Sequence, residues 1–145
     1  MLNPSRFRIL AIGKVRKSWI QNGLEVYRKR LPGLSITEIR DGDIKKESRA
    51  IISSIKKDEL LIALCEEGEK FTSMDFSHWL QNLGSSRIVF AIGGTNGLSQ
   101  EVKTSADLCI SLSALTFPHE MARLILAEQL YRAISIAKGS PYHRE

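Results

Sequence analysis

Hydrophobic and polar residues alternate along the chain in blocks that predict strands followed by helices. Five short runs have the pattern of strands: residues 7–12, 34–39, 60–64, 87–92 and 108–112. Five longer segments repeat apolar residues at helical spacing: residues 18–30, 44–57, 73–83, 100–106 and 118–138. Unbroken apolar runs such as residues 60–64 are typical of strands covered on both faces, whereas the alternation in residues 34–39 predicts a half-buried strand nearer an edge.

This order of elements predicts the α/β fold class, with a mainly parallel sheet and flanking helices. The 145 residues contain no internal repeat, low-complexity tract or linker, so we expect a single domain over residues 1–145. Ser18 is positioned to cap the start of the first helix, and Pro32 and Gly33 are expected to end it.

Composition and charge narrow the environment of the protein. The hydrophobic fraction of 43% and the charged fraction of 26% are those of soluble globular proteins. No apolar run approaches the roughly 20 residues that span a bilayer, and the start has no signal-peptide pattern, so we expect a cytoplasmic protein with no membrane partner. Cys65 and Cys109 lack CxxC spacing, which favours reduced thiols over a disulfide or a metal site. The net charge of +5 mildly favours a polyanionic partner and leaves nucleic acid open.

A glycine-rich segment containing Gly93, Gly94 and Gly97 joins the strand at 87–92 to the helix at 100–106. Glycines permit positive φ and close approach of the backbone to a ligand. The spacing is not that of a dinucleotide-binding fingerprint, and the lysine of a P-loop is absent. Local sequence alone leaves two interpretations, a ligand-binding loop and an ordinary tight turn.

His119 and Arg123 stand four residues apart at the start of the last predicted helix, so they share a helix face. One interpretation is that both point into a pocket. The other is that Arg123 is structural and pairs with a carboxylate, while His119 only begins the helix. Because Arg123 stands where a zinc-binding helix has its second histidine, no metal site is predicted here.

Two further segments offer polar chemistry near the end of the chain. The hydroxyl-rich residues 112–117 can present backbone groups to a heterocycle while apolar side chains cover its faces, although an ordinary connection has the same local pattern. Tyr142, His143 and Arg144 supply a ring that can stack on a base, a titratable imidazole and a cation. The alternative for these three residues is a solvated tail.

Four segments taken together resemble the bacterial ribosomal RNA large-subunit methyltransferase H family, a small branch of the SPOUT methyltransferases. They are Ile-Gly-Gly-Thr-Asn-Gly-Leu-Ser at 92–99, Leu-Ser-Ala-Leu-Thr-Phe-Pro-His at 112–119, Glu-Gln-Leu-Tyr-Arg-Ala at 128–133 and Pro-Tyr-His-Arg at 141–144. The resemblance implies a C-terminal trefoil knot (the α/β-knot) that forms a pocket for S-adenosylmethionine, and a homodimer. It also implies methylation of N3 of a pseudouridine in the helix 69 loop of 23S rRNA, on the assembled ribosome.

Transferred by position, the resemblance implies a set of cofactor contacts from three segments of the chain. These are Leu64, Gly93, Gly94, Leu112, Ser113, Ala114, Leu115, Thr116 and Phe117. The family often has an Asp after the position of Leu64, where this chain has Cys65, followed by Glu66 and Glu67. Either glutamate can replace that carboxylate, or the charge is not needed.

S-adenosylmethionine carries its own electrophilic methyl group, so the protein has to position the reactants and needs no metal. The nitrogen that is methylated must lose a proton. An imidazole can accept that proton, and a guanidinium can favour its loss by stabilising the negative charge left on the ring. The candidate catalytic residues are Tyr142, His143, Arg144, His119 and Arg123. Two other functions fit the residues: a non-catalytic protein that binds RNA or the ribosome, and a nucleotide enzyme of the Rossmann type. Binding of S-adenosylmethionine separates all three.

Overall fold

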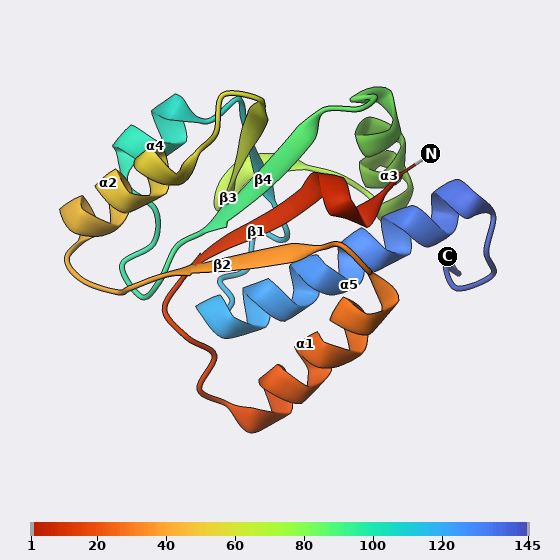
Figure 1. Ribbon diagram of the computed structural model, residues 1–145, viewed down its shortest axis with the longest axis horizontal. Coiled ribbons are helices and arrows are strands. Elements are labelled where there is room, and N and C mark those ends of the chain that lie inside the picture. Colours follow the sequence, from red (N-terminus) through yellow and green to blue (C-terminus); the bar gives the residue numbers. More distant parts are fainter. Residues whose placement is uncertain (1, 145) are drawn as a thin grey trace.

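Five strands form one parallel sheet in the order β2-β1-β4-β3-β5 in the computed structural model, which describes residues 2–144 (Figure 1). The strands are β1 (Phe7–Ile12), β2 (Ser35–Ile39), β3 (Glu59–Lys70), β4 (Arg87–Ile92) and β5 (Leu108–Ser111). The helices are α1 (Ser18–Arg30), α2 (Ile44–Ser54), α3 (Ser73–Asn82), α4 (Gln100–Ser105) and α5 (His119–Lys138), after a short 3₁₀ helix, η1 (Pro4–Arg6). The predicted α/β class with a parallel sheet is therefore confirmed.

Each face of the sheet has its own core, because alternate strand residues point to opposite sides. The larger core joins the strands to α1, α3 and α5 through buried residues that include Ile9, Phe90, Leu24, Leu80 and Leu126. The smaller core joins them to α2 and α4 through residues that include Leu10, Val89, Ile51 and Val102. On the larger side α5 lies between α1 and α3 (Figure 1), so the last helix fixes both of its neighbours against the sheet.

The structure departs from the predicted boundaries at two places and from the predicted cap at one. The helix expected over 44–57 ends at Ser54. The strand expected over 60–64 continues to Lys70. Ser18 does not cap α1: the N-cap position is Lys17, without a side-chain hydrogen bond, and Glu120 of α5 instead accepts the backbone N–H groups of Arg16 and Lys17 at 3.0 and 3.2 Å.

The extra length of β3 follows a bulge in its parallel pairing with β5. Leu64 and Glu69 both pair with Ile110, and the register shifts between them. The chain between these two pairs approaches β5 so closely that a Cβ at Gly68 would lie 2.7 Å from the carbonyl carbon of Ile110. A glycine is therefore required where β3 passes over β5.

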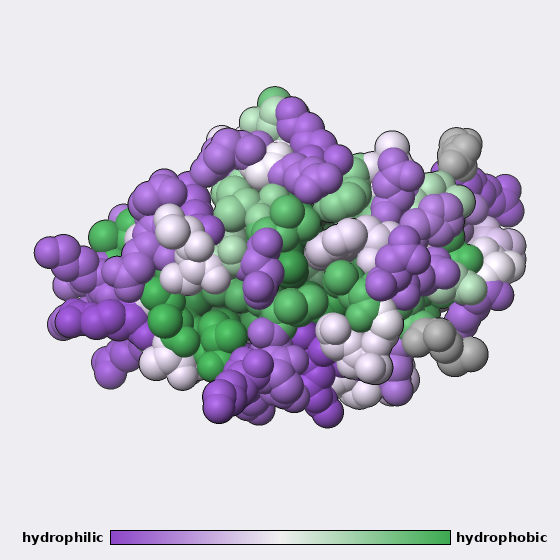
Figure 2. Space-filling model, turned by 90° about the horizontal axis from the view of Figure 1, so that it is seen from above, coloured by the Kyte–Doolittle hydropathy of each residue, from purple (hydrophilic) through white to green (hydrophobic). Residues whose placement is uncertain are grey.

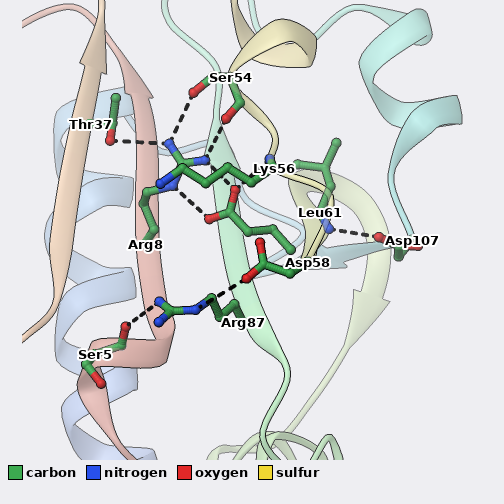
Figure 3. Close-up of polar contacts among 10 residues, drawn as sticks. Ser5, Arg8, Thr37, Ser54, Lys56, Asp58, Leu61, Arg87 and Asp107 are labelled. Carbon is green, nitrogen blue, oxygen red and sulfur yellow. Dashed lines mark hydrogen bonds and ion pairs between the residues drawn. The ribbon is translucent and has the colours of Figure 1, made fainter.

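Polar side chains join the strands at the opposite end of the sheet, where the strands begin (Figure 3). Arg8 of β1 forms two hydrogen bonds to the carboxylate of Glu59, at 2.7 and 3.0 Å. The same guanidinium donates to the Ser54 hydroxyl and carbonyl and to Thr37. Glu59 belongs to β3, Thr37 to β2, and Ser54 to α2. The Arg8 side chain therefore links β1 to two other strands and to α2.

No helix within residues 2–144 combines the length and the apolar character that a membrane crossing needs. Cys65 and Cys109 are both free and half-buried.

Candidate functional site

A cavity of about 510 Å³ opens where β3 leaves its regular pairing and where β4 and β5 end. In parallel α/β sheets, ligands bind outside the carboxyl ends of the strands. The walls of the cavity come from β3, from the loop after β4, from the segment after β5 and from the first turn of α5. The lining residues are Leu64, Cys65, Glu66, Ile92, Gly93, Gly94, Thr95, Gly97, Leu98, Leu112, Ser113, Leu115, Thr116, Phe117, Pro118, His119 and Ala122.

The glycine loop after β4 closes on itself beside the cavity. The backbone N–H of Gly97 donates to the carbonyl oxygen of Gly94 at 3.0 Å, and Gly97 has a φ of +70°. A Cβ at Gly93 would meet the backbone of Gly97, with the carbonyl oxygen at 2.7 Å. A side chain at Gly93 would therefore collide first with the backbone of its own loop.

Residues 112–117, which follow β5, form the outer wall of the cavity. Ser111 donates its hydroxyl to the carbonyl of Ser113 at 2.8 Å, and the Ser113 hydroxyl accepts the backbone N–H of Leu115 at 3.0 Å. These two bonds hold a bend that leaves the Leu115 side chain largely exposed at the mouth. Ala114 does not line the cavity, whereas the other cofactor contacts implied by the resemblance do.

The charged groups of the cavity wall are few. Glu66 supplies a carboxylate, and no lysine or arginine is present among the lining residues. Glu67, its neighbour, instead pairs with Lys103 at 2.6 Å. The hydrogen bond to Lys103 lowers the pKa of the Glu67 carboxyl. Of the two glutamates considered as replacements for the family's Asp, the structure brings Glu66 to the cavity.

Cys65 is the residue that stands at the family's Asp position, and its side chain faces both the cavity and Cys109 of β5. Burial, followed by the charge and hydrogen bonding of Cys109, raises the pKa of Cys65 to about 11. The thiol is therefore neutral near pH 7. Where the family often has a charged aspartate, this chain therefore has an uncharged cysteine at the wall of the cavity.

The structure separates His119 from Arg123. His119 lines the cavity, and its buried Nδ1 has no hydrogen-bond partner among the described residues. Arg123 is fully buried and forms a 2.7 Å ion pair with Glu38 of β2. It also donates to the carbonyl oxygen of Gly13 at 3.0 Å. Of the two interpretations of this pair, the contacts of Arg123 fit the structural one, and His119 alone faces the cavity.

The C-terminal tail is folded back on α5. Tyr142 donates its hydroxyl to the Glu128 carboxylate at 2.8 Å, and its ring packs edge-on against Tyr131 at 4.7 Å between centroids. Arg132 lies over the Tyr142 ring at 4.9 Å and contacts His143 Nδ1 at 3.1 Å. Burial, followed by hydrogen bonds with Tyr27 and Glu128, raises the pKa of the Tyr142 hydroxyl. Tyr142 and His143 are therefore held in place, and Arg144 stays exposed.

The tail and the cavity of one chain are well separated. Glu128 follows His119 by nine residues on the same helix. A helix rises about 1.5 Å and turns about 100° per residue, so Glu128 lies about 14 Å further along α5 and on the opposite side. Tyr142 and His143 are therefore not assembled with His119 within a single chain.

Sequence reasoning missed several residues that organise these two regions: Glu120, Glu128, Arg132 and Glu38. Burial opposes ionisation of Glu120, but the N–H groups of Lys17 and Arg16 outweigh it and lower the pKa of its carboxyl. For Glu128 and Arg132 two signals were available: they belong to the segment 128–133 that resembles the family, and they stand four residues apart, so they can pair along a helix. The partners of Glu120 lie more than one hundred positions away, and no local pattern indicates them.

Comparison with known proteins identifies relatives over the full length. The family model described as "Predicted SPOUT methyltransferase" matches residues 5–143. A protein named "Ribosomal RNA large subunit methyltransferase H" from Prochlorococcus marinus (strain MIT 9211) is 65% identical over 144 residues, which cover 99% of both chains. Its namesake from Synechococcus sp. (strain CC9311) is 57% identical over 143 residues, again covering 99% of each.

Solved structures share the fold at low sequence identity. A probable methylase family protein from Haemophilus influenzae Rd KW20 has a TM-score of 0.65 at 12% identity, covering 98% of this chain and 72% of that one. The SpoU methyltransferase AviRb from Streptomyces viridochromogenes, solved in complex with AdoMet, has a TM-score of 0.50 at 15% identity, covering 92% and 58%. Together with the family match, these similarities confirm the predicted α/β-knot fold.

Proposed function

The chain belongs to the ribosomal RNA large subunit methyltransferase H family of SPOUT methyltransferases, and we propose that it methylates N3 of a pseudouridine in the helix 69 loop of 23S rRNA. The methyl donor is S-adenosylmethionine, and the substrate is the assembled ribosome. The family resemblance supports this target, and the cavity at the carboxyl ends of the strands supports the donor.

The assignment of the methyl donor is supported by the charges of the residues that line the cavity. Its wall is apolar apart from backbone groups, hydroxyls, His119 and the carboxylate of Glu66. S-adenosylmethionine is a sulfonium cation, so it suits a wall with a carboxylate and without lysine or arginine. NAD and ATP carry phosphates, which are usually bound by lysine or arginine as well as by a helix N-terminus; this cavity offers the first turn of α5 but no lysine or arginine among its lining residues. The volume of about 510 Å³ lies in the usual range for sites of small ligands and cofactors.

S-adenosylmethionine, when bound, supplies a methyl group that is already activated on sulfur. The protein's task is to orient the acceptor nitrogen toward that methyl group and to exclude water. With the donor bound, the N3 proton would leave, the nitrogen electron pair would form the new N–C bond, and the methyl–sulfur bond would break with its electrons going to sulfur. Residues that stabilise the negative charge on the ring accelerate this step, and the tail residues Tyr142, His143 and Arg144 are assigned to the target base.

The distance between tail and cavity implies that two chains form each site. Because Tyr142 and His143 sit on the far side of α5 from His119, the tail of one chain acts at the cavity of its homodimer partner. Figure 2 supports an interface: on the face that it draws, hydrophobic residues form a connected band between hydrophilic margins. Large connected apolar areas on a soluble chain mark sites of association.

Methylation of purified ribosomes tests the function. Ribosomes from cells that lack this gene are incubated with the protein and labelled S-adenosylmethionine, and the modified nucleotide is located by mass spectrometry. We expect one methyl group on a pseudouridine of the helix 69 loop. Naked 23S rRNA at equal salt should react far more slowly, because the basic residues of a small chain neutralise phosphates but do not read sequence. Binding to ribosomes without methyl transfer would indicate the non-catalytic alternative.

A further inference from the structure

We propose that Arg132 and Glu128 are positioning residues that fix the tautomer of His143, so that His143 acts as a hydrogen-bond donor to the target base and not as the base that removes its proton. This inference rests on the proposed function, since it assigns the tail to the pseudouridine. It begins from the contact between Arg132 Nη1 and His143 Nδ1 at 3.1 Å.

A guanidinium donates hydrogen bonds but has no lone pair with which to accept one. In its contact with Arg132, His143 Nδ1 must therefore be the acceptor. An imidazolium carries hydrogen on both nitrogens and cannot accept, so the contact requires the neutral ring. In that ring the single hydrogen is on Nε2.

Glu128 holds the arginine in this orientation. Its carboxylate accepts Nε and Nη2 of Arg132 at 3.3 and 2.7 Å, which leaves Nη1 directed at His143. The hydrogen bond to Glu128 raises the pKa of Arg132, so the guanidinium remains charged. Glu128 also accepts the Tyr142 hydroxyl, and one carboxylate thus fixes the arginine and the residue that precedes His143.

The consequence concerns the free nitrogen of His143. Nε2 is buried and has no partner among the described residues. An N–H group without a partner is costly unless a ligand accepts it. N3 of a pseudouridine lies between two carbonyl groups, and loss of its proton spreads negative charge onto both oxygens. Because Nε2 is buried in the single chain, the target base reaches it only when the side chains that cover it move; an Nε2–H directed at one of the oxygens then stabilises that charge, while the N3 proton passes to water.

The tautomer is measured directly by ¹⁵N NMR of the histidine side chains at a pH where the rings are neutral. We expect His143 to show hydrogen on Nε2 and an Nδ1 that accepts a hydrogen bond. His78, which is exposed on α3, provides the internal reference for a free ring. Arg132→Met should move the His143 signals toward those of His78. Hydrogen on Nδ1 of His143 in the parental protein, or signals unchanged by Arg132→Met, would overturn the proposal.

Kinetics on ribosomes separate a donor from a base. Gln at position 143 can place an N–H near the position of Nε2 but cannot take a proton, so His143→Gln should retain kcat within about tenfold, whereas His143→Leu should lose roughly a hundredfold or more. Equal loss in both variants would identify His143 as the base and refute the donor role.

The positioning role has its own kinetic test. Arg132→Met should lower kcat by roughly ten- to a hundredfold with unchanged affinity for S-adenosylmethionine, and Arg132→Lys should restore part of the rate. The matched control is Arg30→Met, because Arg30 packs on Tyr27 and Tyr131 at 5.7 and 5.3 Å. Equal rate losses in Arg132→Met and Arg30→Met would reduce Arg132 to a packing role. If the parental protein does not methylate ribosomes, the proposed function fails, while the NMR result still decides the tautomer.

Discussion

The guanidinium of Arg123 and the carboxylate of Glu38 meet at 2.7 Å, although 85 positions of sequence separate them. The arginine side chain is 2% exposed and the glutamate side chain 39%. Arg123 also donates to the Gly13 carbonyl at 3.0 Å. The first turns of α5 are thereby tied to β2 and to the end of β1, close to the cavity but outside it.

Replacement of Arg123 by Met should destabilise the fold by about 1–3 kcal/mol, because the carbonyl of the half-buried Gly13 loses a charge-assisted hydrogen bond. Glu38→Gln should cost less, about 1 kcal/mol or below, since the carboxylate is partly solvated and screened. Urea unfolding followed by circular dichroism measures both. The control is Arg40→Met on the surface; an Arg123→Met midpoint equal to that of the control would contradict a structural role.

Gly93→Ala should weaken S-adenosylmethionine binding at least about tenfold while the chain stays folded. The new Cβ would lie 2.8 Å from the backbone nitrogen of Leu98, so the glycine loop must open beside the cavity. Calorimetry gives the affinity. Gly42→Ala is the matched control, because Gly42, like Gly93, has no positive φ, and a Cβ there meets no atom of a non-neighbouring residue closer than 3.8 Å. Parental affinity in Gly93→Ala would show that the loop does not shape the site.

The sheet was predictable because burial on both faces leaves a clear pattern. The run at 60–64 and the alternation at 34–39 correspond to an inner strand and an edge strand. The continuation of β3 to Lys70 was not predictable, since Glu66, Glu67 and Glu69 do not read as strand. Beyond the register shift, Glu69 pairs with Ile110 of β5, a constraint that exists only in the folded chain.

The site was predictable in position and less so in detail. Strand ends locate a ligand cavity on general grounds, but the assignment of residues 112–117 to it rested on the family resemblance. Periodicity says nothing of how a chain threads, and general topology disfavours knots, so the knot also came from the resemblance. The roles of Arg123 and Glu120 depend on partners 85 to 110 positions away, which no local pattern encodes.

Cys65 should react slowly with iodoacetamide near neutral pH. The thiolate is the reactive form, and with a pKa of about 11 it makes up only about one part in ten thousand at pH 7. The rate should then rise about tenfold per pH unit until the pH nears that pKa. Mass spectrometry of the peptide that carries Cys65 measures the rate of alkylation.

Removal of the neighbouring thiol provides the control for this prediction. In Cys109→Ala the charge and hydrogen bond that help to raise the pKa of Cys65 are gone, so alkylation at neutral pH should accelerate. Saturating S-adenosylmethionine should slow it again, because Cys65 lines the cavity. Fast alkylation of the parental protein at pH 7, independent of pH, would contradict the assigned environment of the thiol.

Deletion of residues 142–145 should abolish most methyl transfer while leaving S-adenosylmethionine affinity nearly unchanged. The tail packs on Glu128, Tyr131 and Arg132, on the side of α5 opposite His119, so its loss removes no wall of the cavity. Calorimetry and ribosome methylation measure the two quantities separately. A truncated protein that methylates at the parental rate would make the tail dispensable and leave His119 as the better candidate.

Mixing Gly93→Ala with the truncated chain, at a concentration of S-adenosylmethionine too low to occupy the Gly93→Ala cavity, tests whether each site takes its tail from a second chain. A heterodimer of Gly93→Ala with the truncated chain has one complete site, formed by the truncated chain's cavity and the other chain's tail. After unfolding and refolding together, random pairing should restore about a quarter of parental activity, because half of the dimers are mixed and each has one of two sites intact. The control mixes the truncated chain with Arg123→Met, which keeps both cavity and tail. No recovery in the first mixture, with recovery in the control, would place tail and cavity function within one chain.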